Sequence, residues 1–564
     1  MKYQQIVRRM RERTLERPLN RRTFLFGATA ATTGLGTAST QGRGRSTANA
    51  TPAFDSEPFT LGVASGEPLP DGVVIWTRLA PIPFEPFGGM PLESVEVGWV
   101  VAEDERLSKV VRRGTAIAEP DWGHSVHVEV GGLQPDRWYW YQFTAGAEVS
   151  PLGRTKTAPP AGTMTDLRFA FASCQRWDHG LYTAFADMAQ QDLDLVVHLG
   201  DYIYESTIRG NDAGREGPFP SIAFPEPRDL ESYRFRYGLY KLDPDLQEAH
   251  RLFPWLVTWD DHEVYNNVHG ALNRQEPSGL RQLERRAAAY QAYYEHQPLR
   301  RESIPVGPDL QLYRRRAFGD LLEFNVLDTR QYRDLQAMLC GEQGRRDNEG
   351  FCPDALDPAR TMLGERQKAW LFDGLAKTTT RWSALAQQLP MARIDLDPLP
   401  GSTRYGADDL DTWDGYAVER DQVVAAMAGA AARGSNPVVL TGDTHSNAVW
   451  DLKTNWDDGT NRSTVATELV GTSISSGGDT PIEDDGGFTT ECGNRNGNPH
   501  NLLYDNHRGY VMCSVTADRW QADYRILPTV KDPSASASTL ATFVVEHARP
   551  GAHLASGCAS AAPD

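Results

Sequence analysis

The sequence has few cysteines and, after its N-terminus, no apolar run long enough to cross a membrane. Six cysteines in 564 residues are too few for a disulfide scaffold, and a spanning helix needs about 20 consecutive apolar residues. These absences exclude a small disulfide-rich protein and argue against a transmembrane segment. The sequence also lacks a P-loop, a G-x-S-x-G elbow and an H-E-x-x-H motif, so it offers no familiar protein nucleophile or zinc-protease pattern.

Positive charge is scarce outside the first 50 residues. The formal net charge is −18, and because residues 1–50 hold ten Lys/Arg against two Asp/Glu, the rest of the chain carries −26. Such a surface repels polyanions, which argues against a protein that coats nucleic acid. A protein this acidic needs bound cations to reverse the field locally if its ligand is an anion, so the charge is a first indication of metals.

The basic N-terminus predicts export. Arg21-Arg22 is followed by Thr23-Phe24-Leu25, an Ala/Thr/Gly stretch and Ala48-Asn49-Ala50, which is typical of a twin-arginine signal with an A-x-A cleavage site over residues 1–50. The alternative is a basic helix that stays attached. Export implies a periplasmic, cell-surface or secreted protein, with the twin-arginine machinery as a partner. In that compartment Cys340 and Cys352, which bracket a polar loop, are expected to form a local disulfide.

The rest of the chain divides by pattern. Residues 51–160 alternate apolar and polar side chains between turn signals, which predicts a small all-β domain. Within it Tyr139, Tyr141 and Phe143 follow Leu133-x-Pro135, as in the tyrosine-corner strand of fibronectin type III sandwiches. Residues 161–548 alternate strands with helices, and the Ala/Ser-rich residues 549–564 are expected to be a disordered tail.

The region 161–548 is predicted to have an α/β fold. Its strands read as continuous apolar runs joined by helices, which indicates a layered core covered on both faces. The expected strands are 167–173, 193–199, 255–259, 321–328, 382–389 and 437–441, and the expected helices are 181–190, 280–295, 365–376 and 418–432.

Polar residues cluster where four of these strands end. Cys174 follows the first strand, and Asp201 to Tyr204 follows the second. The run from Asp260 to Asn267 follows the third, and Asp443 with His445 follows the last. Because ligands bind at the carboxyl ends of strands in α/β sheets, these four clusters are predicted to meet at one rim.

The residue types at this rim are those that bind metals. Carboxylates suit hard cations, imidazole suits transition metals, and a thiolate or phenolate adds an anionic donor. Tyr204, with an ordinary pKa near 10, ionises at neutral pH only against a strong Lewis acid such as ferric iron. Taken singly, Cys174 and Tyr204 could be packing residues, Asp260-Asp261 a helix cap and Asp443-x-His445 a turn. Four such clusters together favour one metal site, because uncompensated buried carboxylates are unfavourable.

Several motifs carry a family resemblance. Asp201-x-x-Tyr204, the run Trp259 to Glu263 and Gly442-Asp443-Thr444-His445 resemble the signature of the alkaline phosphatase D family of metallophosphoesterases, which includes related secreted phospholipase D enzymes and phosphodiesterases. The agreement extends to four further segments and the twin-arginine signal, so that it covers nearly the whole chain: 62–66, 74–78, 327–330 and 413–416.

The resemblance implies a four-layer α/β/β/α metallophosphoesterase core behind a fibronectin- or immunoglobulin-like sandwich, with Fe³⁺ and one or two Ca²⁺. It assigns Cys174, Tyr204 and His445 to iron, Asp201 to a bridge between the metals, and Asp443 to calcium. Asp261 and Asn266 both remain candidates for a further calcium ligand. Asp260 is either an additional metal ligand or a residue that contacts a ligand without binding the metal itself.

His262 occupies the position that contacts phosphate or protonates the leaving group in related phosphoesterases. A purely supporting hydrogen bond to a carboxylate is the alternative for His262, and a structural role is favoured for Arg330.

The expected reaction is hydrolysis of phosphate mono- and diesters for phosphate release, by in-line attack of a metal-bound hydroxide or oxide. Two other functions stay open. The same metal core could act on lipid phosphodiesters as a phospholipase D. The chain could also be an exported binding protein whose acidic loops hold calcium, although this does not account for Cys174 and Tyr204 beside the carboxylates.

Overall fold

A computed structural model of the protein describes residues 54, 56–211, 213–215, 219–270, 277–336, 353–394, 410–456, 461–477, 490–493 and 498–558. The proposed twin-arginine signal, the proposed Cys340–Cys352 disulfide and residues 559–564 lie outside these ranges. Among the residues that are described, no helix is both long and apolar enough to span a membrane.

The larger of the two central sheets has ten strands in the order β23-β22-β21-β20-β9-β10-β11-β1-β2-β5. Its middle strands β9, β10 and β11 are parallel and read as buried apolar runs, because both faces of the sheet are covered. The ten strands are β1 Val63–Leu69, β2 Gly72–Arg78, β5 Ser125–Gly131, β9 Leu167–Ala172, β10 Leu195–His198, β11 Pro254–Val257, β20 Arg508–Val515, β21 Arg519–Leu527, β22 Ser538–Glu546 and β23 Arg549–Gly557.

The second central sheet has eight strands in the order β12-β13-β14-β15-β17-β16-β19-β18. Here β13, β14, β15 and β17 are parallel neighbours, and the remaining pairings are antiparallel. The eight strands are β12 Arg314–Phe318, β13 Leu322–Val326, β14 Trp382–Ala386, β15 Asn436–Thr441, β16 Asn447–Lys453, β17 Thr464–Val470, β18 Thr490–Glu491 and β19 Asn501–Asp505.

The helices form the two outer layers. Their bounds are α2 Thr183–Met188, α3 Leu230–Lys241, α4 Pro244–Leu252, α5 Pro277–His296, α6 Gly364–Lys377 and α7 Ala417–Ala432. Asp229 caps α3 through a capping box with Ser232, and Asp243 caps α4, whose first residue is Pro244. The six predicted strands and four predicted helices of this region are all present, with ends that differ by a few residues.

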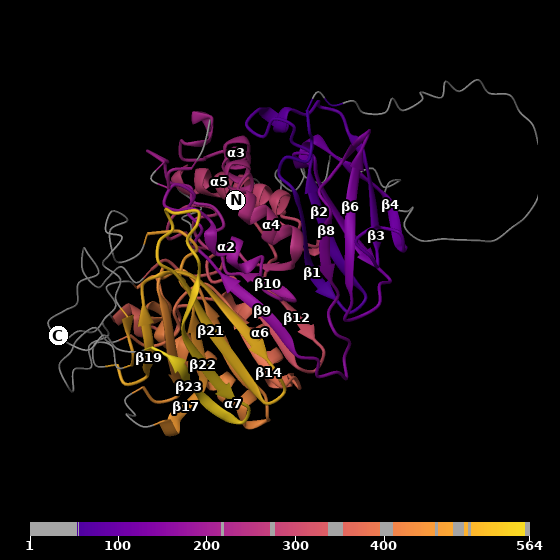
Figure 1. The fold of residues 1–564 in the computed structure, drawn as a ribbon. Coiled ribbons are helices and arrows are strands. Elements are labelled where there is room, and N and C mark those ends of the chain that lie inside the picture. The colour runs from indigo at the N-terminus through magenta and orange to yellow at the C-terminus, as the bar shows by residue number, and fades with distance from the viewer. Residues whose placement is uncertain are drawn as a thin grey trace, which may run out of the picture.

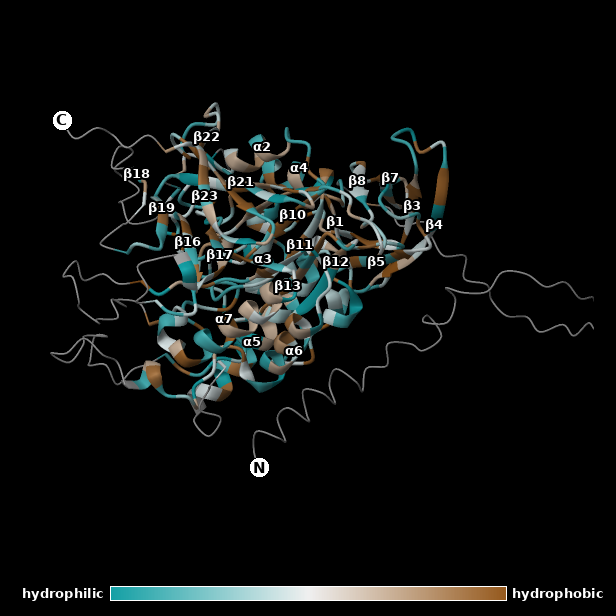
Figure 2. Cartoon of the chain, turned by 90° about the horizontal axis from the view of Figure 1, so that it is seen from below, coloured by the Kyte–Doolittle hydropathy of each residue, from teal (hydrophilic) through white to brown (hydrophobic). Residues whose placement is uncertain are grey.

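Three apolar cores separate four layers. One core packs α2 to α5 against one face of the ten-stranded sheet, a second fills the space between the two sheets, and a third packs α6 and α7 against the eight-stranded sheet. Figure 1 shows α2 to α5 grouped in the upper part of the view and α6 and α7 in the lower part, and Figure 2 shows hydrophobic residues on many of the strands towards the centre. The layer order is therefore helix, sheet, sheet, helix.

The N-terminal all-β region is joined to the larger sheet. Its second sheet consists of β3 Val95–Ala102, β4 Val110–Ala118, β6 Trp138–Ala145, β7 Glu148–Val149 and β8 Gly153–Lys156. A separate apolar core packs this sheet against β1, β2 and β5. The hydroxyl of Tyr139 accepts a hydrogen bond from the backbone N–H of Gln134 at 2.9 Å, the kind of contact that a tyrosine corner makes.

The end of the chain corrects the sequence prediction. Residues 549–557, expected in a disordered tail, form β23, which pairs antiparallel with β22 along its length. Cys558 then forms a disulfide with Cys492, 66 residues away in sequence. Ala/Ser composition indicates that this segment lacks apolar residues, but backbone pairing with β22 and the covalent link order it nevertheless.

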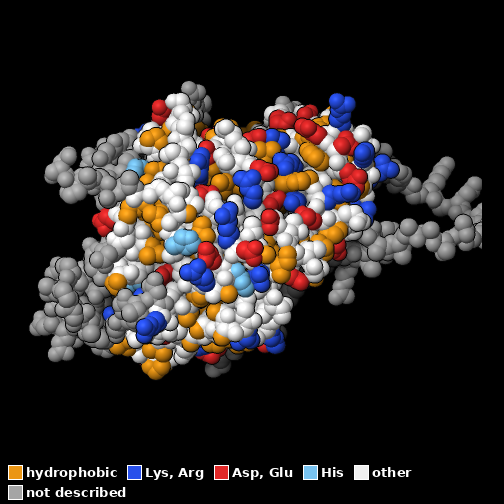
Figure 3. Space-filling model, turned by 60° about the horizontal axis from the view of Figure 1, so that its bottom comes forward, with side chains coloured by type: hydrophobic (Ala, Val, Ile, Leu, Met, Phe, Trp, Pro, Cys, Tyr) orange, Lys and Arg blue, Asp and Glu red, His pale blue; other side chains and the backbone are white. Residues whose placement is uncertain are grey.

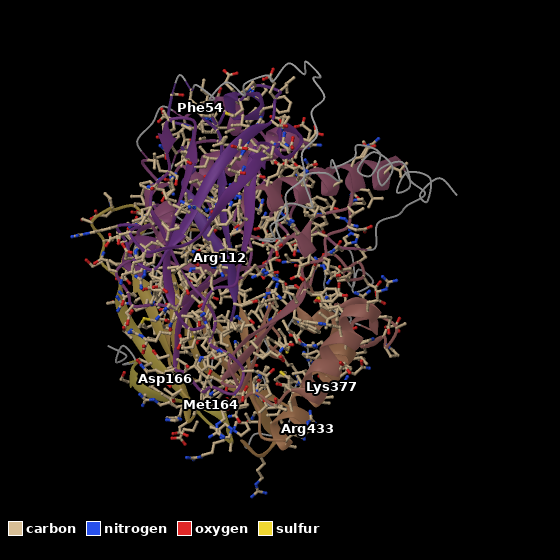
Figure 4. All side chains as sticks on the ribbon, turned by 90° about the vertical axis from the view of Figure 1, so that its right-hand side faces the viewer. Phe54, Arg112, Met164, Asp166, Lys377 and Arg433 are labelled. Carbon is tan, nitrogen blue, oxygen red and sulfur yellow. A yellow bond between two sulfur atoms is a disulfide. The ribbon has the colours of Figure 1, made fainter. Side chains whose placement is uncertain are left out.

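All the parallel strands run in one direction, which fixes where a site can lie. Asp166, Lys377 and Arg433 shortly precede β9, β14 and β15 and lie at the end of the molecule opposite Phe54 (Figure 4). That end therefore carries the amino ends of the strands, and the carboxyl ends face the other way. On the face drawn in Figure 3, acidic, basic and apolar side chains are interspersed, so no large patch of one charge marks a binding surface there.

Candidate metal centre

The predicted clusters meet at the junction of the two sheets. Cys174 lies just beyond β9, Asp201 beyond β10 and Asp260 beyond β11, all three in the ten-stranded sheet, whereas Asp443 follows β15 of the eight-stranded sheet. The site is therefore formed by strand ends of two facing sheets and not by the rim of a single one.

Two glycines allow the strand ends to approach this closely. A Cβ atom on Gly200 would lie 2.4 Å from Cβ of Asp260, and the φ of Gly200 is +110°, which other residues rarely adopt. A Cβ atom on Gly442 would lie 2.8 Å from the side chain of Ser173. Each glycine directly precedes a candidate ligand, so the ligands are brought together by the absence of a side chain beside them.

Four carboxylates converge in the centre of the site. One oxygen each from Asp201, Asp260, Asp261 and Asp443 can be chosen so that all lie within 4.8 Å of one another. Burial, reinforced by the neighbouring carboxylates, raises the pKa of Asp201 and of Asp443 well above the ordinary value. This repulsion means that the ionised cluster needs a compensating positive charge.

A second group of donors adjoins the carboxylates. The Cys174 sulfur, an Asp201 oxygen and a His445 ring nitrogen lie within 4.8 Å of one another. The hydroxyl of Tyr204 is 2.9 Å from Nε2 of His445. Burial and the charge of Asp201 raise the pKa values of both Cys174 and Tyr204 well above their ordinary values. Both groups are thus neutral without a cation, and only a strong Lewis acid would bind them as anions.

Arg330 supplies part of the compensating charge. Its fully buried guanidinium donates through Nε to Asp260, through Nη1 to Asp411, and through Nη2 to Asp443 at 3.2 Å. Nη2 also lies 3.5 Å from an oxygen of Asp261. Although burial opposes ionisation, Arg330 and His262 lower the pKa of Asp261 to about 2. The residue for which the sequence favours a structural role is therefore the cationic centre of the carboxylate cluster.

The cluster still has unsatisfied oxygens. Oδ2 of Asp260 and Oδ1 of Asp261 are buried and accept no hydrogen bond from the residues that the structure describes, and Oδ1 of Asp261 has only the ion-pair contact with Arg330 at 3.5 Å. Leaving a buried charged acceptor without a partner is strongly unfavourable. A cation bound among these carboxylates would supply the missing contacts and favour their ionised forms. The residues present therefore fit a metal ion on structural grounds.

His262 lies at the edge of this cluster and is held in place on two sides. Its Nδ1 is 2.6 Å from Oε2 of Glu205, and its ring stacks on Tyr204 with centroids 4.2 Å apart. Its backbone N–H donates to Asp201 at 3.3 Å. Burial disfavours the charged imidazole, but Asp261, Asp201 and Glu205 together raise the pKa of His262 well above the ordinary value.

The two calcium-ligand candidates of this segment differ in burial. Asn266 is exposed, and its backbone N–H donates to Oε1 of Glu205 at 2.9 Å. Asp261, the other candidate in this segment, is buried among the carboxylates and accepts a hydrogen bond from the backbone N–H of Asn267.

Three carboxylates at the site escaped the sequence reasoning. Glu205 directly follows Tyr204, and Glu263 directly follows His262. Their position beside predicted site residues is the sequence feature that could have identified them. Asp411, which accepts a hydrogen bond from Arg330 and forms an ion pair with Arg333, lies two residues before the segment 413–416, and nothing in the pattern connects it with the site.

The backbone at the site is strained. Cys174, Asp201, Asp443 and His445 have φ angles of 58°, 55°, 64° and 53°, in the left-handed region that residues with a Cβ seldom occupy. Such conformations persist only where the surrounding structure enforces them, and they concentrate at functional sites.

Comparison with known proteins places this site in a family. A family model described as PhoD-like phosphatase matches residues 169–524, and a model of the N-terminal domain of PhoD-like phosphatases matches residues 45–159. Alkaline phosphatase D of Bacillus subtilis (strain 168) is 44% identical over 553 residues, which span 98% of this chain and 92% of that protein. A solved structure described as "Structure of PhoD" is similar with a TM-score of 0.80 and 43% sequence identity, covering 90% of this chain and 94% of that one.

Both matched segments meet in one molecule, and the strand ends of the longer segment carry the candidate metal ligands. The chain is a hydrolase that belongs to the PhoD-like phosphatase family.

Proposed function

We propose that this phosphoesterase hydrolyses phosphate mono- and diesters outside the cytoplasm, with Fe³⁺ and Ca²⁺ as cofactors. The observation that carries the proposal is the convergence of a thiol, a phenol and an imidazole with four carboxylates, three of them buried. Two of the carboxylate oxygens accept no hydrogen bond within the described part of the chain. A site that only holds calcium has no use for the thiol and the phenol, because Ca²⁺ prefers oxygen ligands such as carboxylates and carbonyls.

The two kinds of donor divide the ligands between the two metals. Cys174, Tyr204 and His445 would hold iron, and Asp443 would hold calcium, with Asp201 shared because its oxygens belong to both groups. Between the two open candidates we favour Asp261 over Asn266 as a further calcium ligand, since only Asp261 is buried in the cluster. When bound, these cations supply Lewis acidity that neutralises phosphate oxygens and lowers the pKa of the attacking water.

His262 would contact the phosphate or protonate the leaving group. Because Glu205 holds Nδ1, Nε2 is the nitrogen available to contact phosphate or to donate a proton to the departing alkoxide. Glu205 favours the protonated imidazole and, with the stacked Tyr204 ring, fixes its orientation. A histidine held this way contributes typically ~10²–10⁴ in rate as a general acid.

Export by the twin-arginine route is proposed from residues 1–50. The Cys492–Cys558 disulfide supports it, since disulfides persist mainly outside the reducing cytoplasm. A protein with an iron centre also suits a route that carries folded proteins.

The substrate class is tested by assaying the purified protein, loaded with iron and calcium, on nitrophenyl phosphate, bis-nitrophenyl phosphate and phosphatidylcholine. We expect release of nitrophenol from both nitrophenyl esters, and none from an Asp443→Asn control that removes a proposed ligand charge. Cleavage of phosphatidylcholine alone would identify a phospholipase D. Hydrolysis of none of the three with both metals bound would favour a binding protein.

The division of ligands predicts two separable defects in metal content. The double variant Tyr204→Phe, Cys174→Ser should lose iron and its visible charge-transfer band while keeping calcium. Asp261→Asn should lower bound calcium and keep the band, because it removes a charge only from the carboxylate group. Elemental analysis and an absorption spectrum of each protein measure both quantities.

Asn266→Ala is the matched control for this experiment, since its side chain is exposed whereas that of Asp261 is buried. It should retain both metals. Loss of calcium from Asn266→Ala, together with full retention in Asp261→Asn, would reverse our choice between the two residues.

The pairing of His262 with Glu205 predicts non-additive kinetics. His262→Ala should lower kcat by ~10²–10⁴ with a substrate whose leaving group needs a proton, and Glu205→Gln should lower it less. If Glu205 acts through His262, the double variant should be no slower than His262→Ala. Steady-state kinetics on an alkyl phosphate measure this, and losses that multiply would show that the two side chains act independently.

The proposed route predicts that Arg21→Lys combined with Arg22→Lys keeps the protein in the cytoplasm, because it removes the paired guanidinium groups of the signal. Cell fractionation and immunoblotting of the producing strain measure the location. Unchanged export of this variant would contradict the twin-arginine assignment.

A further inference from the structure

Glu263 ends the acidic run that supplies Asp260 and Asp261, yet none of the roles derived above uses it. Its side chain is buried, with 1% of its surface exposed. Its carboxylate accepts hydrogen bonds from three backbone N–H groups: those of Asp201 at 3.1 Å, Tyr202 at 2.5 Å and Asp260 at 2.8 Å. Within the described part of the chain, all the hydrogen bonds that this carboxylate accepts thus come from the backbone at or beside two candidate metal ligands.

These amides lie where the strands stop pairing. The ladder between β10 and β11 ends at His198 and Val257, and the chain then turns sharply through Gly200 and Asp201, whose φ angles are 110° and 55°. Buried N–H groups that leave a sheet without another acceptor are strongly unfavourable. The two oxygens of Glu263 replace the missing rungs and tie the end of β10 to the end of β11.

The contacts of Glu263 differ in kind from those of the neighbouring carboxylates. Asp260 is paired with Arg330 and belongs to the carboxylate cluster, whereas Glu263 reaches behind the ligands to their backbone. A carboxylate in this position sets the separation between Asp201 and the Asp260–Asp261 pair without contacting a metal. Groups that orient ligands in this way typically change metal affinity by ~10–100-fold when removed.

We propose that Glu263 is a positioning residue that presets the spacing of the metal-binding carboxylates, and so determines the affinity of the site for calcium. This inference rests on the proposed function, in which Asp201 and Asp261 bind Ca²⁺.

The other sheet supplies a matched control. Glu468 on β17 is also fully buried and accepts from the backbone N–H groups of Met391 and Ala392, each at 2.8 Å, and from the hydroxyl of Thr441 at 2.7 Å. Glu468 thus also accepts hydrogen bonds from backbone N–H groups that follow a strand, but none of its partners is a candidate metal ligand. Replacing either glutamate by glutamine puts an NH₂ group against backbone donors and loses a similar set of contacts.

The test compares Glu263→Gln and Glu468→Gln in the purified protein loaded with iron and calcium. Calcium affinity is measured by competition with a chromophoric chelator, and the visible band of the iron centre and the melting temperature are recorded alongside. Both variants should melt below the wild type by similar amounts. Glu263→Gln should need ~10–100-fold more Ca²⁺ for half-saturation, with a shifted band, whereas Glu468→Gln should stay within about twofold of the wild type.

Wild-type calcium affinity in Glu263→Gln, or an equal loss in Glu468→Gln, would overturn the proposal. If Glu263→Gln does not fold, Glu263→Asp keeps the carboxyl group but shortens its reach, and should give a weakened affinity that wild-type values would refute. A wild-type protein that binds neither calcium nor iron would instead refute the proposed function, so the two failures are distinguishable.

Discussion

The cost of burying several like charges at one point governs this structure. Asp201, Asp260 and Asp261 are buried and Asp443 is partly exposed beside them, and neighbouring carboxylates disfavour the ionisation of Asp201 and Asp443. Arg330 offsets part of this repulsion with a single positive charge. The residual negative charge and the two oxygens without hydrogen bonds define what else the site must bind, which is cationic. A cation bound there would reverse the local field, which favours the approach of an anionic substrate to an acidic protein.

Bringing those charges together requires backbone conformations that are unfavourable unless the surrounding structure enforces them. Positive φ angles at Cys174, Asp201 and Asp443 turn each chain abruptly as it leaves its strand, and Gly200 and Gly442 remove the side chains that would keep the strand ends apart. Strain of this kind costs of order 1–3 kcal/mol per residue. It is sustained by the cores on both faces of each sheet, so the extensive packing of the four layers is what makes the geometry of the site possible.

Most of the secondary structure and most of the clustered residues were predictable from sequence, for a physical reason. A strand buried on both faces reads as an apolar run, and a polar residue directly after such a run is visible as an exception; this applies to Cys174, Asp201 and Asp443 alike. Periodicity carries no information about which sheet a strand joins, so the separation of β15 from β9, β10 and β11 could not be foreseen.

The hydrogen-bond and ion-pair partners of the polar residues could not be predicted from the sequence either. Arg330 was known as part of a motif, but its contacts with Asp260, Asp411 and Asp443 join residues 70 to 113 positions away. The pairing of Glu205 with His262 also spans two strand ends. The prediction of a disordered tail over residues 549–564 was wrong for β23 for a different reason. An Ala/Ser-rich composition indicates only how little apolar surface a segment can bury. This segment is ordered by backbone pairing with β22 and by the disulfide between Cys558 and Cys492.

The N-terminal region supports the site structurally, although none of its described residues is a candidate metal ligand. Its strand β1 pairs in parallel with β11, with Ser65 opposite Pro254, so the ten-stranded sheet runs continuously from one family segment into the other. Without β1, β11 would be an edge strand, with free backbone groups on one side. The turn that carries Asp260 and Asp261 follows β11 directly. The position of half of the carboxylate cluster therefore depends on a region that contributes no ligand, which explains why the two segments form a single unit around the site.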